Sequence, residues 1–260
     1  MKINVFDRES FRGSTPVLIA HRGGVVTAEA PECSLEAIRL AAQHGYRMVE
    51  LDIQESKDHV PIVFHDRNMY EDCGIEKEIS DLTVEEIAEV YLFKTGQKVR
   101  SDQRISTSDE ALAVCSELGL GVMLDIKTEG SEQFFRRIAE GIEKYGFDRS
   151  TVSISLMPTA QKLLDGKVMF RMSSDDIARV ERQEPLSLQG KFWFGEPKYI
   201  TNDMVRECQR RGALVIPAIN IFRYPSDTNH ERAKEDIARM KQAGADAYQI
   251  DSVYEAYFRE

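Results

Sequence analysis

The sequence predicts a (β/α)8 barrel, in which eight parallel strands alternate with helices. Short apolar runs typical of buried strands recur along the chain, and helical patterns lie between most of them. Eight such units in 260 residues match the usual size of this barrel, about 250 residues. A doubly wound open sheet is the alternative, but no G-x-G-x-x-G follows any strand. The predicted strands begin near residues 17, 47, 121, 151, 167, 191, 213 and 247.

The first unit begins with the apolar run at residues 17–20, followed by a turn containing Gly23 and Gly24. Ser34 caps a helix that extends to residue 44. Further helices are predicted at residues 108–118, 132–145, 158–164, 175–182, 203–211 and 230–242. The later strands are predicted at residues 121–126, 151–155, 167–171, 191–194, 213–217 and 247–250.

Residues 61–64 form a second apolar run soon after the strand at residues 48–53. A parallel crossover needs about a dozen residues or more, and the connecting segment is shorter than that. The two runs therefore predict an antiparallel hairpin. Its return brings His65 back beside Glu50.

Residues 66–107 differ from the alternating units around them because they are mostly polar. One short helical pattern at residues 83–90 begins with Thr83 and Glu86 in capping-box spacing. We interpret this segment as a small insertion within a single barrel domain of residues 1–260. We expect it to cover one side of the site.

Composition and charge limit the function further. The formal net charge of −10 argues against nucleic-acid binding, although it permits a local basic pocket for a phosphate. No apolar run approaches the length of a transmembrane helix, so we expect no stable membrane insertion. The oligomeric state stays open. The chain starts without a signal-peptide run and its cysteines lack C-x-x-C spacing, which favours a cytoplasmic protein; a trimmed leader would leave no trace.

Carboxylates recur near the ends of the second and third strands. Glu50 and Asp52 alternate with apolar residues, so a strand points both to one face. Asp125 lies late on the next strand, and the carboxyl ends of barrel strands meet at one rim. Such oxygen ligands suit one divalent cation, Mg²⁺ or Ca²⁺. The alternative, that Glu50 and Asp52 lie on a solvated sheet face, stays open at this point.

Two histidines and two basic residues are expected at the same rim. His21 and Arg22 end the first strand, His65 follows the hairpin, and Lys127 follows Asp125. Histidines beside a metal suit general acid and base catalysis, and the basic groups suit a phosphate. Other interpretations remain. His21 can be a core histidine, Lys127 can pair with Asp125, and Lys127 can form a Schiff base as in aldolase-type barrels.

The order of these motifs resembles that of the glycerophosphodiester phosphodiesterase family over most of the chain. The matching segments are Ala20-His21-Arg22-Gly23-Gly24, Ala30-Pro31-Glu32-Cys33-Ser34, Glu50-Leu51-Asp52-Ile53, Lys57-Asp58, Phe64-His65-Asp66, Leu124-Asp125-Ile126-Lys127 and Ala243-Gly244-Ala245-Asp246 with Asp251. The N-terminal set is the most specific part, since several motifs coincide in order.

The resemblance implies a TIM barrel with a small insertion and an activity, the metal-dependent hydrolysis of glycerophosphodiesters to an alcohol and glycerol 3-phosphate. The partner it implies is a small-molecule phosphodiester. By the same likeness, three groups of residues have roles: His21 and His65 as general acid and base, Glu50, Asp52 and Asp125 as ligands of one divalent ion, and Arg22, Lys127 and Glu32 as phosphate contacts and support.

The chain departs from the family pattern at three places. Cys33-Ser34 stands where the family usually has Asn-Thr, and Asp125 stands where it usually has Glu. That Asp recurs in sphingomyelinase-type phospholipases D. Pro217-Ala218-Ile219-Asn220 replaces Trp-Thr-Val-Asn, so the aromatic wall is lost or is supplied by Phe222 or Tyr224.

These departures affect the substrate more than the type of reaction. The alternatives are a phospholipase D-like activity or another phosphodiester substrate in the same barrel. Less favoured are a Schiff-base lyase that uses Lys127 and a barrel that only binds a phosphorylated ligand. The sequence does not assign the headgroup, the physiological metal, or which histidine is the acid.

Overall fold

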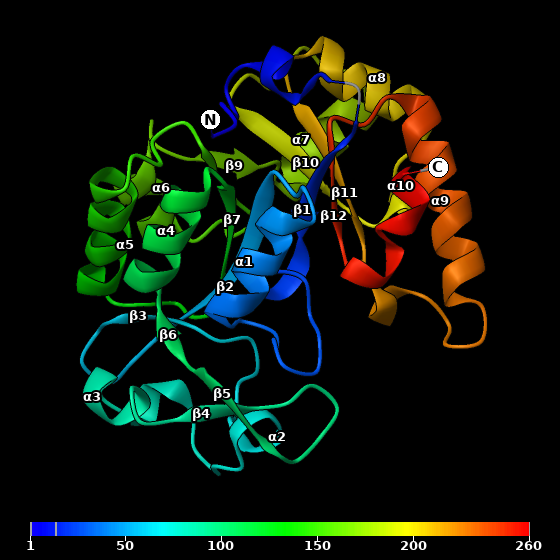
Figure 1. Cartoon of the computed structure of the whole chain (residues 1–260). Helices are drawn as coiled ribbons and strands as arrows, with labels where there is room; N and C mark the ends of the chain where they lie inside the picture. The colour runs from blue at the N-terminus through cyan, green and yellow to red at the C-terminus, as the bar shows by residue number, and fades with distance from the viewer. Residues whose placement is uncertain (1, 14, 260) are drawn as a thin grey trace.

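The central feature of the computed structural model, which describes residues 2–13 and 15–259, is a closed parallel sheet. Its strands in chain order are β1 (Val17–Ala20), β2 (Met48–Glu55), β7 (Gly121–Ile126), β8 (Thr151–Ser153), β9 (Met169–Arg171), β10 (Lys191–Gly195), β11 (Leu214–Ile219) and β12 (Ala247–Ile250). Each pairs in parallel with the next, and β1 pairs with both β2 and β12, which closes the barrel (Figure 1). The predicted (β/α)8 TIM barrel is confirmed.

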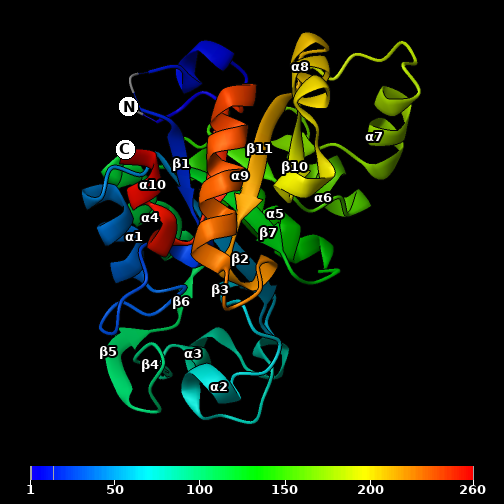
Figure 2. The same cartoon turned by 90° about the vertical axis from the view of Figure 1, so that its right-hand side faces the viewer.

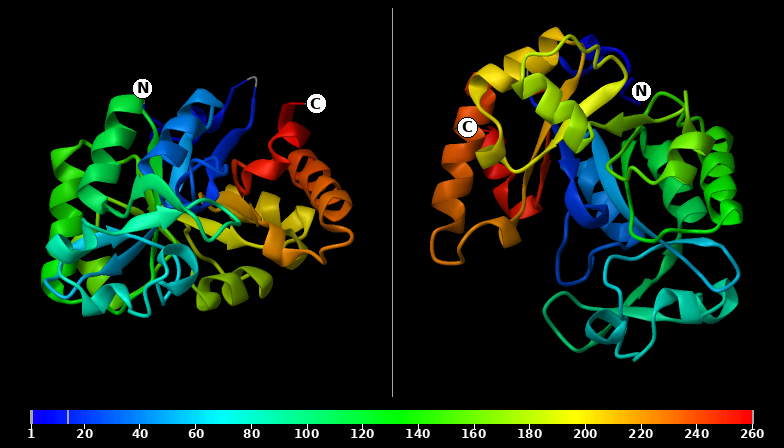
Figure 3. Two further views of the ribbon diagram at one scale, coloured as in Figure 1. Left: turned by 60° about the horizontal axis from the view of Figure 1, so that its bottom comes forward. Right: turned by 180° about the vertical axis from the view of Figure 1, so that it is seen from behind.

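Helices follow the strands and surround the barrel, as two further views show (Figures 2 and 3). They are α1 (Leu35–Gln43), α4 (Ser108–Leu118), α5 (Glu132–Lys144), α6 (Pro158–Leu164), α7 (Ser174–Glu181), α8 (Asn202–Arg210), α9 (Asn229–Ala243) and α10 (Ala256–Arg259). Several begin where a hydroxyl side chain accepts a hydrogen bond from the first turn, namely at Ser34, Thr107, Ser131, Ser173 and Thr201. The sequence predicts all of these helices except α10, within two residues at each end.

Apolar side chains fill the end of the barrel that carries the amino ends of the strands. Ile3, Val5 and Phe11 pack there against strand residues that point inward, including Ile19 and Met123. The short helix η1 (Arg8–Phe11) lies across this end, far from the carboxyl ends of the strands (Figure 1). The site must therefore lie at the opposite rim, as in other barrels of this type.

The predicted hairpin is present. β3 (Pro61–Val63) pairs antiparallel with β2, with Val63 opposite Ile53, and the Phe64 N–H donates to the Asp52 carbonyl oxygen at 3.0 Å. The pairing thus ends at the level of Asp52 and does not reach Glu50. The sequence, in contrast, predicts His65 beside Glu50. Because Ala20 of β1 pairs with Val49, His21 is the histidine level with Glu50.

The insertion begins after β3 and returns through β6 (Ser106–Thr107), which pairs antiparallel with β3. Between them lie α2 (Tyr70–Cys73), η3 (Ile79–Asp81), α3 (Val84–Ile87), β4 (Tyr91–Phe93) and β5 (Arg100–Arg104). The predicted capping box is present at Thr83, but the helix is shorter than expected, and the antiparallel pair of β4 and β5 is not predicted.

A separate apolar cluster holds the insertion together; it includes Phe64, Ile79, Ile87 and Leu92. The segment lies at the rim where β2 ends, on the opposite side of the barrel from η1 (Figures 1 and 2). Among the described helices, each is too short or too polar to cross a membrane.

Candidate active site

Three carboxylates converge inside the barrel. Glu50 and Asp52, on β2, are 1% and 0% exposed, so the alternative that they lie on a solvated sheet face is wrong. Strand register places Asp125 of β7 opposite Asp52. Glu50, Asp52 and Asp125 each offer an oxygen, and these oxygens lie within 4.8 Å of one another. Parallel pairing of two strands with alternating side chains is what brings the three acids together.

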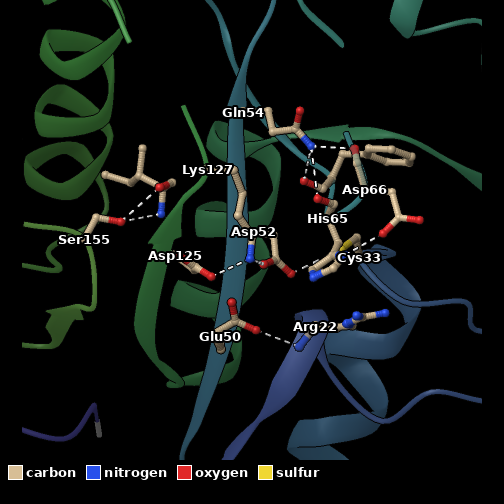
Figure 4. Close-up of polar contacts among 12 residues, drawn as sticks. Arg22, Cys33, Glu50, Asp52, Gln54, His65, Asp66, Asp125, Lys127 and Ser155 are labelled. Carbon is tan, nitrogen blue, oxygen red and sulfur yellow. Dashed lines mark hydrogen bonds and ion pairs between the residues drawn. The ribbon is translucent and has the colours of Figure 1, made fainter. Parts of the chain in front are cut away.

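Lys127 neutralises part of this charge. Its ammonium forms ion pairs with Asp52, at 2.9 Å, and with Asp125 (Figure 4). Burial alone would lower the pKa of Lys127, but the two carboxylates outweigh burial and raise it. The amine is therefore protonated and paired, as the alternative of an Asp125–Lys127 pair anticipates.

Glu50 is the least compensated of the three acids. Burial, and then repulsion from Asp52 and Asp125, raises its pKa well above the usual range, although the Arg22 N–H donates to Glu50 Oε2 at 2.7 Å. One ammonium against three carboxylates leaves negative charge buried. A hard divalent cation prefers such oxygen ligands, so these residues fit one.

The turn after β1 directs that Arg22 N–H toward Glu50. In η2 (His21–Gly23), Arg22 has a left-handed backbone with φ 52°, and Gly24 follows with φ 154°. A Cβ on Gly24 would lie 2.0 Å from the carbonyl oxygen of Ala37, so only glycine lets the turn pack so closely on α1. The predicted glycine turn thus contributes to the site by letting the backbone pack closely on α1.

Asp251 holds His21. His21 Nδ1 lies 2.6 Å from Asp251 Oδ1, and the Ile221 N–H donates to the other carboxylate oxygen at 2.6 Å. Burial alone would raise the pKa of Asp251, but its contact with His21 lowers it. Since Asp251 follows β12 and Ile221 follows β11, closure of the barrel positions this histidine.

An aromatic ring stands beside His21. Phe222, in η5 (Ile221–Arg223), has its ring centroid 6.0 Å from that of His21 and is 64% exposed. Tyr224 instead donates a hydrogen bond to Asp236 at 3.1 Å and packs with the surrounding core. Of the two aromatic residues that the sequence offers as a wall, Phe222 is the one that contacts a candidate catalytic group.

His65 is held by neighbours in the chain. Its Nδ1 lies 2.6 Å from Asp66 Oδ1. The Gln54 side-chain amide donates to the carbonyl oxygens of Phe64 and Asp66, at 2.8 Å each, and so fixes the backbone on both sides of the histidine (Figure 4). Glu32 also reaches this group, within 4.8 Å of His65 and Asp66.

Arg22 and Glu32 form the outer edge of the site. Nη1 of Arg22 lies 2.9 Å from both carboxylate oxygens of Glu32. Burial alone would lower the pKa of Arg22, but Glu32 outweighs it and raises the pKa. Next to Glu32, the Cys33 thiol points to Asp52 Oδ2 at 3.8 Å, and burial followed by the nearby acids raises its pKa well above the usual range. Cys33 therefore stays a thiol that can donate to Asp52.

The structure thus brings all eight predicted site residues to one rim, and it adds Asp251, Asp66, Gln54 and Phe222. No role is predicted from the sequence for Asp251, Asp66 or Gln54. Asp66 was visible as the residue after His65, whereas Asp251 is far from His21 in the chain. Only its position directly after the last strand pointed to the rim.

A family model described as the glycerophosphoryl diester phosphodiesterase family matches residues 21–253. The chain belongs to this family. The matched range contains every residue of the site described above. The glycerophosphoryl diester phosphodiesterase family depends on a divalent metal, and the three carboxylates form an acidic cluster of the kind that binds one.

Glycerophosphodiester phosphodiesterase 1 of Homo sapiens is 31% identical over 193 residues, which is 70% of this chain and 53% of the human protein. The chain therefore spans about half the length of this relative, and the match to its Mus musculus counterpart covers 33% of that protein. A glycerophosphodiester phosphodiesterase of Caldanaerobacter subterraneus subsp. tengcongensis is 26% identical over 246 residues, which is 90% of this chain and 93% of that relative.

Solved structures of the glycerophosphoryl diester phosphodiesterase family share the barrel. An Oleispira antarctica phosphodiesterase in complex with the product sn-glycerol-3-phosphate superposes with a TM-score of 0.72. It is 22% identical and covers 97% of this chain and 99% of its own. At this identity the likeness establishes the fold.

Proposed function

We propose that the protein hydrolyses glycerophosphodiesters to an alcohol and glycerol 3-phosphate. The observation that carries the proposal is the placement of two aspartate-held histidines along one edge of β2, next to the carboxylate trio of Glu50, Asp52 and Asp125. Family membership and the relatives named glycerophosphodiester phosphodiesterase support the same activity. The substrate is a small molecule.

His21 and His65 are the proposed general acid and base. Each has Nδ1 within 2.6 Å of a carboxylate oxygen, which favours the tautomer with the proton on Nδ1. Nε2 is then the nitrogen that accepts a proton from the attacking hydroxyl or donates one to the departing alcohol. The geometry is consistent with attack by water or by the neighbouring glycerol hydroxyl.

Glu50, Asp52 and Asp125 are the proposed ligands of one divalent cation, Mg²⁺ or Ca²⁺. Such a cation supplies an electrophilic contact for a phosphate oxygen when bound. Arg22 and Lys127 are the proposed positive contacts for the phosphate, and Glu32 orients Arg22 through its carboxylate. The Cys33 thiol and the Arg22 N–H keep the two buried acids in place.

The environment of Lys127 argues against a Schiff-base lyase. A Schiff-base lysine needs a lowered pKa so that its amine is free to attack a carbonyl. The pKa of Lys127 is raised, and its ammonium is paired with Asp52 and Asp125. Attack through this amine would require both ion pairs to break.

Turnover of a panel of glycerophosphodiesters, with and without EDTA, tests the proposal. We expect release of glycerol 3-phosphate that EDTA abolishes and that added Mg²⁺ or Ca²⁺ restores, which also identifies the preferred ion. Turnover that EDTA does not affect would contradict the metal site, and trapping of a carbonyl substrate by borohydride would favour the lyase. Binding of the diesters without any turnover would favour a phosphate-ligand binder.

A further inference from the structure

Arg171 is the last residue of β9 and points into the barrel. Side chains alternate along a strand, and Met169 packs in the apolar cluster inside the barrel. Phe170 packs instead on the outer cluster, which contains helix residues such as Ile38. Arg171 therefore shares the inward face of Met169 and lies at the carboxyl end of its strand, the rim that carries the candidate active site. No role is predicted for it from the sequence, and the proposed mechanism does not use it.

The strand β9 lies opposite β1 in the barrel, because it is the fourth strand from β1 in both directions around the closed sheet. His21 directly follows β1, and the carboxylate trio lies on β2 and β7. Arg171 therefore faces His21 across the opening of the barrel. A phosphate in the centre of this opening would have His21 on one side and Arg171 on the other.

The Arg171 side chain makes no hydrogen bond or salt bridge within residues 2–13 and 15–259. Its Nε is buried, and the side chain as a whole is half-buried. Apolar side chains flank it, since Phe192 is its register partner on β10 and Ile154, after β8, packs on the cluster inside the barrel. A charged group that is held partly out of water without a partner is costly. Such a charge does not stabilise the fold, and its position suits a ligand instead.

The two other cations that are proposed as phosphate contacts are already engaged by carboxylates. Arg22 is held by both oxygens of Glu32, and Lys127 is held by two aspartates of the trio. A phosphate would share each of these cations with an acid that is already in contact. Arg171 has no such competitor among the described residues, so its charge and its donors are open to an anion.

Asn220 offers a second donor on the same side of the barrel. It follows β11, in which Ile216 belongs to the inner cluster, so alternation turns the Asn220 side chain inward. Asn220 is 0% exposed. Its Oδ1 accepts a hydrogen bond from Nε of Arg223 at 2.8 Å, which leaves Nδ2 buried and without a partner among the described residues. An amide N–H and a guanidinium both suit the oxygens of a phosphate.

We propose that Arg171 binds the phosphate of the substrate from the wall opposite His21. The inference rests on the proposed function and adds a specific residue to it, one that lies outside the family motifs in the sequence. The planar guanidinium can donate two parallel hydrogen bonds to two phosphate oxygens, which an ammonium cannot. Because every glycerophosphodiester carries this phosphate, the contact raises affinity without selecting the alcohol.

The same contact should hold the product. Cleavage turns a diester phosphate with one negative charge into a monoester, which carries a charge of about −1.5 to −2 at pH 7. The acids that hold Arg22 and Lys127 repel the added charge, whereas Arg171 has no acid in contact with it. We therefore expect inhibition by glycerol 3-phosphate to depend on Arg171 more strongly than binding of the substrate does.

Steady-state kinetics with two diesters test the assignment. We expect Arg171→Gln to raise KM for glycerophosphocholine and for glycerophosphoglycerol by the same factor, about tenfold or more, because both lose a charged hydrogen bond to the phosphate. The value of kcat should stay within about threefold, since the contact is made in the bound substrate as well. The inhibition constant of glycerol 3-phosphate should rise more than KM. Arg171→Lys should recover part of the loss, because it keeps the charge without the paired donors.

Arg149→Gln is the matched control. It removes the same charge from the opposite end of the barrel, where the Arg149 guanidinium lies 5.1 Å from the ring centroid of Phe6. It should leave KM and kcat unchanged for both diesters. An unchanged KM in Arg171→Gln, or a rise for only one of the diesters, would overturn the phosphate contact while leaving the proposed function in place. Because the charge has no partner in the fold, the Tm of Arg171→Gln should not fall; a lower Tm with an unchanged inhibition constant would mark Arg171 as structural.

Titration with inorganic phosphate separates this contact from the proposed function, because it needs no turnover. In calorimetry with Mg²⁺ present, the wild-type protein and Arg149→Gln should bind phosphate alike, and Arg171→Gln should bind it about tenfold more weakly. If no diester is hydrolysed, the proposed function fails and this titration still decides the role of Arg171. Equal affinities for phosphate with and without Arg171 would refute the contact.

Discussion

The two histidines of the site are held by different parts of the molecule. His21 and its partner Asp251 have side chains only 9% and 20% exposed, and they directly follow the first and last strands of the barrel. His65 and its partner Asp66 are adjacent in the chain and are 24% and 40% exposed. One half of the site is thus fixed by barrel closure, and the other by local contacts at the edge of the insertion.

This difference indicates that the two halves of the site have different roles. The barrel half depends on the pairing of β1 with β12, so it cannot move without disturbing the closed sheet. The insertion half packs on its own apolar cluster and can change without altering that pairing. We therefore expect the barrel to set the reaction and the insertion to set the range of leaving groups.

The largest expected effect is at the centre that both halves share. Asp52→Asn should weaken divalent-cation binding by more than about 100-fold, because groups that merely orient a metal ligand already contribute 10- to 100-fold. Turnover should fall below detection. Calorimetric titration with Mg²⁺ and Ca²⁺ measures the first effect, with Asp102→Asn, an exposed position of the insertion, as control. Full cation affinity in Asp52→Asn would remove this residue from the ligand set.

Loss of either histidine should come next. His21→Ala and His65→Ala should each lower kcat by about 100-fold or more, because each removes one proton transfer. Cation affinity should stay within a few fold, since neither imidazole is a proposed ligand. If either variant kept full activity, its histidine would have no catalytic role, and only the other histidine would be needed for the reaction.

Substitution of the aspartate beside each histidine compares the two halves of the site directly. Asp251→Asn should lower kcat by about tenfold or more, because the buried His21 has that carboxylate as its Nδ1 partner. Asp66→Asn should cost only a few fold, because Asp66 is more exposed to solvent, which screens its charge. Profiles of kcat against pH for the two variants measure both effects. Equal losses would show that the two halves are equally rigid.

The smallest effect concerns stability. In the metal-free protein, the raised pKa of Glu50 means that the folded state holds a proton that the unfolded state releases above about pH 4.3. Stability from this group is therefore present below that pH and is lost as the pH rises toward the folded-state pKa. Glu50→Gln removes the penalty, and each 1 kcal/mol of relief should raise Tm by about 2–4 °C.

Thermal melts in EDTA check this prediction. The gain of Glu50→Gln over the wild-type protein should grow as the pH rises from about 4.3 toward the folded-state pKa, and it should shrink as the pH falls toward 4.3. Added Mg²⁺ should stabilise the wild-type protein more than the variant, because the variant lacks one proposed ligand. A variant with a lower Tm than the wild-type protein in EDTA at pH 7 would show that the buried Glu50 carboxylate does not destabilise the metal-free folded state.

The barrel could be predicted from the sequence because its signals are local. Alternation of apolar residues marks the strands, hydroxyl caps mark the helix starts, and the paired acids on β2 face one way in any strand. The candidate ligands and histidines could be predicted for the same reason, with help from the family motifs. The strand and helix boundaries differ by a few residues at most.

Contacts that depend on closure or on packing could not be predicted in this way. The role of Asp251 requires β12 to lie beside β1, which no local pattern states. The strand β5 reads Arg-Ser-Asp-Gln-Arg, a polar run without apolar alternation, and it forms because its partner β4 packs on the apolar cluster of the insertion.

The way the insertion joins the barrel has a consequence for how members of this family diversify. It leaves through β3 and returns through β6, which are hydrogen-bonded neighbours with Val63 opposite Ser106. Its two ends are therefore only about 4.8 Å apart, the spacing of paired strands. A segment with adjoining ends can be lengthened, shortened or exchanged between homologues without changing the shape of the barrel, so the insertion is the part of the chain that can vary most freely within the family.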